Sequence, residues 1–244
     1  MAKVTEIDAF MNTLAPQSLA EKWDNVGLLV HGADEVTGVL CALDITPQVI
    51  KEAIAADCNV IVAHHPVIFE PLKKLEADEP AAQLIQNKIS AICMHTNLDA
   101  ATGGVSDVLA QTLGFTPSAA FSGCGRIIYA DTTVQALVQK ASALGGKTAY
   151  HDAGKPIKTL AIVGGAGGDF VKDAAALGAD CLFTGEVHYH DALDAQRIGL
   201  SFVAAGHYET EQPIVAVLCE KISAAFSDLR VVVSACTASP YTYY

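Results

Sequence analysis

The chain has 244 residues, which is enough for one large domain or two small interlocked ones. Hydrophobic residues make up 51% of it and charged residues 17%, so the composition favours a well-filled core and argues against disorder. With 15 basic and 27 acidic residues, the formal charge of -12 argues against nucleic acids and anionic membranes, which bind clustered Lys and Arg. A phosphate-bearing small molecule stays possible, but it would need local cations such as bound metal ions.

The cysteines and the first residues indicate a cytoplasmic protein. The seven cysteines form no C-x-x-C pair, and several lie in apolar stretches, which predicts buried thiols in a reducing compartment. Residues 1–16 mix Lys3, Glu6 and Asp8 with apolar side chains, so we expect an amphipathic helix there and no signal peptide. No run approaches the ~20 apolar residues that span a bilayer, and we expect no membrane contact.

Helices and strands alternate along the first half of the chain. Thr46 and Pro47 suit the N-cap and the first position of a helix. The predicted elements are helix 4–14, strands 26–30 and 39–44, helix 46–56, strand 60–63, helix 81–87, strand 91–95 and helix 105–113.

The second half repeats this order. Residues 49–58 resemble residues 171–181, which indicates a duplication. The predicted elements are helix 133–144, strands 147–151 and 159–163, helix 169–177, strand 181–184, helix 190–197, strand 201–205, helix 214–226 and strand 230–234. We therefore predict an α/β protein with mixed, mainly parallel sheets, built from two repeats, 1–122 and 123–244. A cleft between such halves is a favoured ligand site.

Side chains that can bind metal ions follow three of the predicted strands. His64 and His65 end the apolar strand 60–63, and the ends of strands carry the chemistry in open α/β sheets. Because successive strand side chains alternate faces, these two imidazoles could serve two neighbouring ions. Asp99 follows the strand 91–95, and the matching strand of the second half leads to His207 and Glu211.

Five ligands of this kind predict a pair of divalent ions. Imidazole nitrogen and carboxylate oxygen suit zinc, iron, manganese or nickel. Paired ions usually lie ~3.5–4 Å apart and share a bridging water, which becomes a nucleophile. Five protein ligands across two ions leave positions open, as a catalytic site requires.

Two further segments have two interpretations each. Glu186, His188 and His190 occupy the place in the second half that His64 and His65 hold in the first. They are candidates for acid–base groups facing the cleft, but Glu186 could equally cap a helix. The Gly164–Gly168 run does not fit the nucleotide-binding pattern G-x-G-x-x-G, so a tight turn lining the cleft is favoured over a nucleotide fingerprint.

Several motifs together resemble those of the Nif-three-like family, also known as GTP cyclohydrolase I type 2 homologs, in its short bacterial form. They occur in the family's order at 23–28, 64–66, 95–99, 184–186 and 206–211. The resemblance implies two intertwined α/β repeats and a toroidal homohexamer whose sites face an internal cavity. It also implies that His65 and Asp99 hold one ion, that His64 and His207 hold the other, and that Glu211 bridges them.

The resemblance implies a metal-dependent hydrolase of the cyclohydrolase type. A metal-bound hydroxide would attack a purine ring carbon such as C8 of GTP, while Glu186 or His190 moves protons. The same hydroxide could instead hydrolyse another amide, an amidine or a phosphate ester. The alternative from another class is a non-catalytic, regulatory metal-binding ring, which predicts closed metal coordination.

Overall fold

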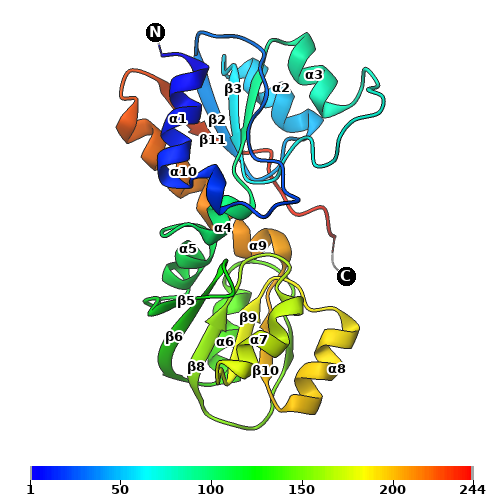
Figure 1. Ribbon diagram of the computed structural model, residues 1–244, viewed down its shortest axis with the longest axis vertical. Helices are drawn as coiled ribbons and strands as arrows, with labels where there is room; N and C mark the ends of the chain where they lie inside the picture. Colours follow the sequence, from blue (N-terminus) through cyan, green and yellow to red (C-terminus); the bar gives the residue numbers. More distant parts are fainter. Residues whose placement is uncertain (1, 243–244) are drawn as a thin grey trace. The chain divides into compact units, whose positions relative to one another are not determined.

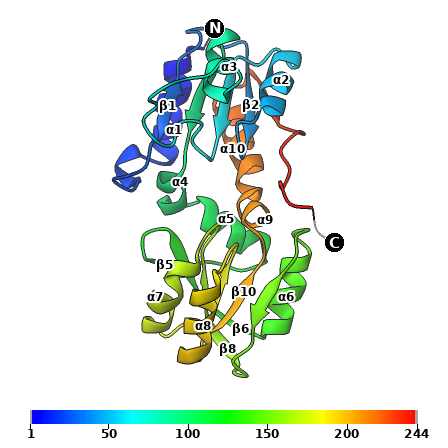
Figure 2. The ribbon, with the colours of Figure 1, turned by 90° about the vertical axis from the view of Figure 1, so that its right-hand side faces the viewer.

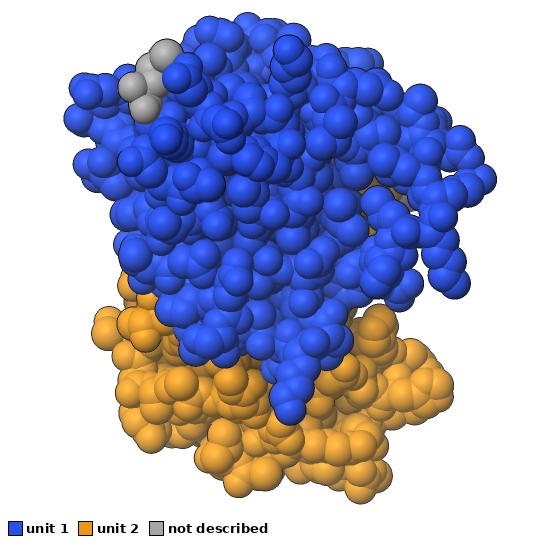
Figure 3. Space-filling view, turned by 45° about the horizontal axis from the view of Figure 1, so that its top comes forward, with its two compact units in different colours: residues 1–101, 215–238 blue, residues 102–214, 239–244 orange. Residues whose placement is uncertain are grey.

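The structure is a computed structural model that describes residues 2–242, so the outermost ends of the two predicted repeats lie outside it. The chain divides into two compact units, coloured in Figure 3. The first unit contains residues 1–101 and 215–238, and the second contains residues 102–214 and 239–244. The predicted boundary between residues 122 and 123 falls inside the second unit. The two divisions differ because the chain returns near its end to complete the first unit.

The first unit contains a five-stranded sheet in the order β1-β4-β3-β2-β11. Strand β1 runs antiparallel to β4, whereas the other neighbours are parallel. Figure 1 shows helices α1 and α10 on one side of the sheet and α2 and α3 on the other. The elements are α1 (Val4–Leu14), η1 (Gln17–Leu19), β1 (Gly27–Val30), β2 (Gly38–Ala42), α2 (Pro47–Ala55), β3 (Val60–Ala63), α3 (Pro80–Gln86), β4 (Ser90–Cys93), α4 (Thr96–Ala100), α10 (Pro213–Ala225) and β11 (Arg230–Val233).

The first sheet forms where the sequence is apolar without interruption. Every residue of β2, β3 and β4 is buried, as expected for parallel strands covered on both faces. Helix α2 begins as predicted, because the Thr46 hydroxyl accepts a hydrogen bond from the Val49 amide at 3.2 Å and Pro47 takes the first position. The apolar face of α2 then packs on the sheet through Val49 and Ile50.

The second unit contains a six-stranded sheet in the order β5-β6-β8-β9-β10-β7. Only β8, β9 and β10 are parallel to one another, so the sheets are mixed as predicted, but the parallel pairs predominate only in the first. The elements are α5 (Val105–Thr112), β5 (Ala119–Phe121), β6 (Gly125–Thr132), α6 (Val134–Ser142), β7 (Ala149–His151), β8 (Ile157–Ile162), η2 (Gly168–Phe170), α7 (Val171–Ala176), β9 (Cys181–Thr184), α8 (Tyr189–Ile198), β10 (Ser201–Ala204) and α9 (His207–Glu211).

Helices cover both faces of the second sheet. Leu109 of α5 and Leu137 of α6 belong to one buried cluster, while Ala174 of α7 and Ala195 of α8 belong to another that includes different residues of the same strands. Figure 2 shows α6 and the pair α7 and α8 on opposite sides of this sheet. Strands β5 and β6 were not predicted from the sequence. No helix within residues 2–242 combines the length and the apolar character needed to cross a membrane.

The parallel strands determine where polar side chains gather. The carboxyl ends of neighbouring parallel strands lie along the same edge of a sheet. In the first unit, the residues that follow β2, β3 and β4 therefore meet at one edge, and these include Asp44, His64 and His95. In the second unit, the residues that follow β8, β9 and β10 meet in the same way, and these include Gly165, Glu186 and His207.

Candidate metal site

Three imidazole rings meet at the edge of the first sheet. His64, His65 and His95, called the histidine cluster below, each place one ring nitrogen within 4.8 Å of the others. The ring centroids are 4.9 Å apart for His64 and His65, 5.4 Å for His64 and His95, and 5.8 Å for His65 and His95. Several imidazole nitrogens in one place are a donor set for zinc or another transition metal.

The backbone carries these rings slightly beyond the ends of the strands. The His65 amide donates to the Leu43 carbonyl at 3.0 Å, which continues the pairing of β3 with the segment after β2. The Met94 amide donates to the Ala63 carbonyl at 2.9 Å and does the same between β4 and β3. The histidines therefore stand on backbone held by the sheet, and this limits their movement.

Each ring of the histidine cluster directs Nδ1 toward an oxygen acceptor. His64 Nδ1 lies 2.7 Å from the Met94 carbonyl, which can only accept, so this nitrogen carries the proton. His65 Nδ1 lies 2.7 Å from Asp44 Oδ1, and His95 Nδ1 lies 2.9 Å from Asp24 Oδ1. Donation through Nδ1 leaves the lone pair of a neutral ring on Nε2, the arrangement that carbonyl or carboxylate partners give to metal-ligating histidines.

Asp24 anchors His95. Its carboxylate accepts hydrogen bonds from the Thr96 amide at 2.9 Å and from the Thr96 hydroxyl, in addition to the bond from His95. Burial by itself would raise the pKa of Asp24, but the hydrogen bonds from Thr96 and His95 outweigh it and hold that pKa below its ordinary value. Burial lowers the pKa of His95 despite the bond to Asp24. His95 is therefore neutral at pH 7, as a metal ligand must be.

Asp99 faces His64 across a gap. Its Oδ1 lies 3.7 Å from His64 Nε2, which is longer than a hydrogen bond, and the His64 side chain is fully buried. Asp99 lies in the first turn of the short helix α4, which begins directly after His95. A buried imidazole nitrogen and a carboxylate oxygen at this separation fit a site for a cation better than a direct hydrogen bond.

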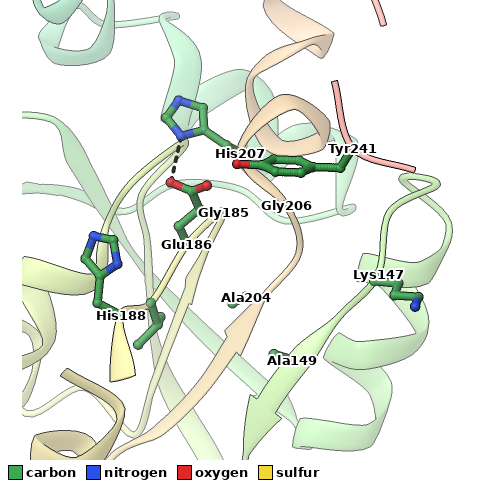
Figure 4. Close-up of a pocket in the computed structure, with 10 residues that line it drawn as sticks. Lys147, Ala149, Gly185, Glu186, His188, Ala204, Gly206, His207 and Tyr241 are labelled. Carbon is green, nitrogen blue, oxygen red and sulfur yellow. Dashed lines mark hydrogen bonds and ion pairs between the residues drawn. The ribbon is translucent and has the colours of Figure 1, made fainter. Parts of the chain in front are cut away.

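The second unit brings together a histidine and two carboxylates. His207 and Glu211 lie four residues apart on α9, and Nε2 of His207 is 3.1 Å from Glu211 Oε2. Nδ1 of His207 is 3.0 Å from Glu186 Oε2, as drawn in Figure 4. The hydrogen bond to Glu211 raises the pKa of His207 to about 9, with a further contribution from Glu186 and against the opposing effect of burial.

A glycine loop packs against this group. Gly165 lies in the segment after β8 with φ +64, and a Cβ atom there would lie 2.1 Å from Glu211 Oε1 and 3.2 Å from His207 Nε2. The amides of Gly185 and Glu186 both donate to the Gly165 carbonyl, at 2.9 and 3.0 Å. The loop is thus a tight turn that touches the predicted ligands, and glycine is required where it does so.

A pocket of about 320 Å³ opens beside His207 in the second unit. Figure 4 shows Glu186, His188 and His207 on its walls, together with Lys147 and Tyr241.

His190 is not among the residues that line this pocket. It lies exposed on α8, where its ring contacts that of Tyr189 with centroids 5.5 Å apart. The catalytic roles proposed for Glu186 and His190 stay predictions.

The sequence-predicted ligands therefore occur in two groups. The first unit holds His64, His65 and Asp99 close together, and the second holds His207 and Glu211. His95 belongs to the first group but was not among the predicted ligands. The duplication contained a signal for it, because His95 and His207 each stand four residues before a predicted carboxylate ligand.

Comparisons with known proteins agree over nearly the whole chain. Residues 2–240 match a family model described as Duf34/NIF3 (NGG1p interacting factor 3). A protein from Clostridium perfringens named "GTP cyclohydrolase 1 type 2 homolog" is 34% identical, with 99% of each chain covered. A Helicobacter pylori protein named "GTP cyclohydrolase 1 type 2" is 36% identical, covering 90% of this chain and 91% of its own.

Solved structures show the same fold. The hypothetical protein SA1388 of Staphylococcus aureus superimposes with a TM-score of 0.89 at 28% identity, over 100% of this chain and 99% of its own. Reduced HcgD from Methanocaldococcus jannaschii gives a TM-score of 0.83 at 26% identity, over 95% of this chain and 97% of its own. The resemblance found in the sequence motifs is therefore confirmed, and the chain belongs to the Duf34/NIF3 family.

Proposed function

We propose that this protein is a metal-dependent hydrolase of the GTP cyclohydrolase 1 type 2 kind, with two divalent ions per chain. The observation that carries the proposal is the shared orientation of four histidines. His64, His65, His95 and His207 all place Nδ1 at a carbonyl or carboxylate oxygen, the arrangement in which a neutral imidazole uses Nε2 as its metal-binding nitrogen. In His207, Nε2 contacts Glu211 Oε2 at 3.1 Å, so this ring would have to lose a proton to bind a metal. The names of the relatives support the reaction class.

Following the family pattern, we propose that His65 and Asp99 bind one ion, that His64 and His207 bind the other, and that Glu211 bridges them. Nitrogen and carboxylate donors suit zinc, iron, manganese or nickel. When bound, the ions would supply Lewis-acid chemistry and lower the pKa of a coordinated water.

Residues of the protein orient these ligands and handle protons. Asp44 holds the His65 ring by accepting the Nδ1 hydrogen bond, and Glu186 does the same for His207. Glu186 also lines the pocket, so its carboxylate is placed to take up or return a proton during hydrolysis of a substrate bound there. His188 lines the same pocket and can donate a hydrogen bond to such a substrate.

Elemental analysis of the purified protein tests the proposed centre. We expect about two transition-metal ions per chain, by analogy with other paired-metal hydrolases. His65→Ala and Glu211→Ala should each lose metal while the circular dichroism spectrum stays unchanged. His31→Ala is the matched control, because this histidine lies elsewhere, half exposed and paired with Asp34 at 3.0 Å.

Turnover is tested with the metal-loaded protein and GTP, by following loss of the nucleotide chromatographically. Loss of activity in Glu211→Ala and retention in His31→Ala would support the hydrolase. Stoichiometric metal without turnover of GTP or of other amides and phosphate esters would instead favour the non-catalytic metal-binding protein. Absence of metal, even after reconstitution with zinc, manganese and iron, would refute the centre itself.

A further inference from the structure

Two aromatic side chains stand exposed next to the histidine cluster. Trp23 is 60% exposed and Phe69 is 50% exposed, although most large apolar residues of the first unit lie in its core. The Trp23 and Phe69 rings are 5.7 Å apart between centroids, and each lies 6.2 Å from the ring of His95. Together they form an aromatic corner around a histidine that belongs to the candidate metal site.

Burial in the core does not account for this arrangement. An indole that leaves most of its surface in water gains little of the stabilisation that its size could provide. The contacts with His95 are edge-on, at interplanar angles of 72° for Trp23 and 73° for Phe69. The exposed surface of the indole is therefore available to a further planar group.

The two loops that carry these rings are fixed to each other and to the cluster. Asn25 Nδ2 donates to the Ile68 carbonyl at 2.6 Å and ties the Trp23 loop to the Phe69 loop. Asp24, the neighbour of Trp23, is held by Thr96 and His95. The aromatic corner is thus positioned before any ligand arrives, which reduces the entropic cost of binding there.

We propose that Trp23 and Phe69 form the subsite for the planar heteroaromatic ring of the substrate, which stacks on Trp23 beside the histidine cluster. Aromatic faces attract purine-like rings by offset stacking, whereas an open-chain amide or a simple phosphate ester has no face to offer. The inference rests on the proposed function for the reaction, and it selects ring-bearing nucleotides from the substrate classes left open above.

The chain offers a direct probe, because Trp23 is its single tryptophan. In the metal-loaded protein we expect both GTP and guanosine to quench tryptophan fluorescence, since both carry the ring. Inorganic triphosphate should leave the fluorescence unchanged. Absence of quenching by guanosine at saturating concentration would overturn the proposal.

Calorimetric titration of variants with guanosine provides a second test of the subsite. Trp23→Ala should bind about tenfold more weakly, the loss expected for one stacked base, and Trp23→Phe should lose less because it keeps an aromatic face. Tyr129→Ala removes another exposed aromatic ring, 73% exposed on β6, and should bind like the native protein. Equal affinity of native protein and Trp23→Ala would overturn the proposal.

These experiments separate the subsite from the metal centre. Trp23→Ala should keep the native metal content, because Trp23 is not a proposed ligand. Metal binding without ring-dependent quenching would reject the subsite and leave the centre standing. Quenching by guanosine in a protein that binds no metal would reject the metal centre and leave the subsite standing. A blue-shifted, ligand-insensitive tryptophan emission, with a changed oligomer mass in Trp23→Ala, would identify Trp23 as an assembly contact and overturn the proposal.

Discussion

Burial and hydrogen bonds together determine the protonation states of His95 and His207. His95 and His207 stand at matching places in the two halves, yet their surroundings shift their pKa values in opposite directions. Burial lowers the pKa of His95, while the hydrogen bond to Glu211 raises the pKa of His207 to about 9. At pH 7 and without metal, His95 is therefore neutral and His207 is protonated. The difference matters because only a neutral ring can ligate a metal.

We predict that metal binding competes with a proton on His207. Because its pKa is about 9, the apparent metal affinity should rise about tenfold per pH unit from pH 7 and level off near pH 9. Glu186→Gln removes one of the causes of the raised pKa, so its affinity should level off at lower pH. Titration against a competing chelator across this pH range provides the measurement. Equal affinities at pH 7 and pH 9 would contradict the prediction.

The same shift has a consequence for the stability of the metal-free protein. A group whose pKa is higher in the folded state stabilises that state when protonated. The ion pair of His207 with Glu211 therefore contributes fully below the ordinary histidine pKa of 6.5, and the contribution is lost as the pH rises through about 9.

At the scale of elements, the site depends on connections between strands and helices. The Gly165 turn after β8 touches Glu211 of α9, and the Glu186 segment after β9 touches His207 of the same helix. Helix α9 itself has only five residues, too few to be stable alone, so its position depends on contacts such as these.

We predict that Gly165→Ala damages the metal site more than the fold. The new methyl group would lie 2.1 Å from Glu211 Oε1, and the flexible carboxylate would have to move aside. Because the ligand is displaced, the metal affinity of the variant should fall about tenfold or more. Gly178→Ala is the matched control, since it shares a positive φ of +77 but meets no atom within 4 Å.

Both variants incur the backbone strain of a left-handed residue, roughly 1 kcal/mol. Thermal unfolding of the metal-free proteins should show this loss in both variants, with any further loss in Gly165→Ala reporting the disturbed ion pair of Glu211 with His207. Elemental analysis should show loss of metal in Gly165→Ala alone. A Gly165→Ala protein with native metal content would show that Glu211 has room to adapt or that it binds no ion.

The sequence predicted secondary structure well where a local signal, such as an apolar run or a helix N-cap, was strong. The uninterrupted apolar run before His64 and the Thr46-Pro47 helix start predicted β3 and α2 almost to the residue. Strand β6 escaped prediction because its outer half alternates only weakly and pairs through contacts distant in sequence. His95 escaped for a different reason. The spacing that it shares with His207 was a signal for it, but the contact of its ring with those of His64 and His65 depends on the register of β3 against β4, which a single sequence does not display.

At the scale of the whole molecule, the family pattern leads us to propose a toroidal homohexamer. Light scattering coupled to size-exclusion chromatography should then give a mass six times that of one 25.5 kDa chain. Closed rings are a common outcome of repeated identical interfaces, so we expect this mass to persist on moderate dilution. A stable monomer or dimer at micromolar concentration would contradict the proposal.

The return of β11 to the first sheet limits when that sheet can finish folding during synthesis. Strand β11 pairs with β2 across nearly two hundred residues, so one edge of the first sheet stays uncovered until the ribosome has made the last part of the chain. Every residue that lies between the two segments of the first unit, from 102 to 214, emerges before that edge is closed. The unit that begins first is thus completed only after nearly all of the second has been made. The nascent chain carries an unpaired strand edge for most of its translation, which exposes it to misassociation in the crowded cell.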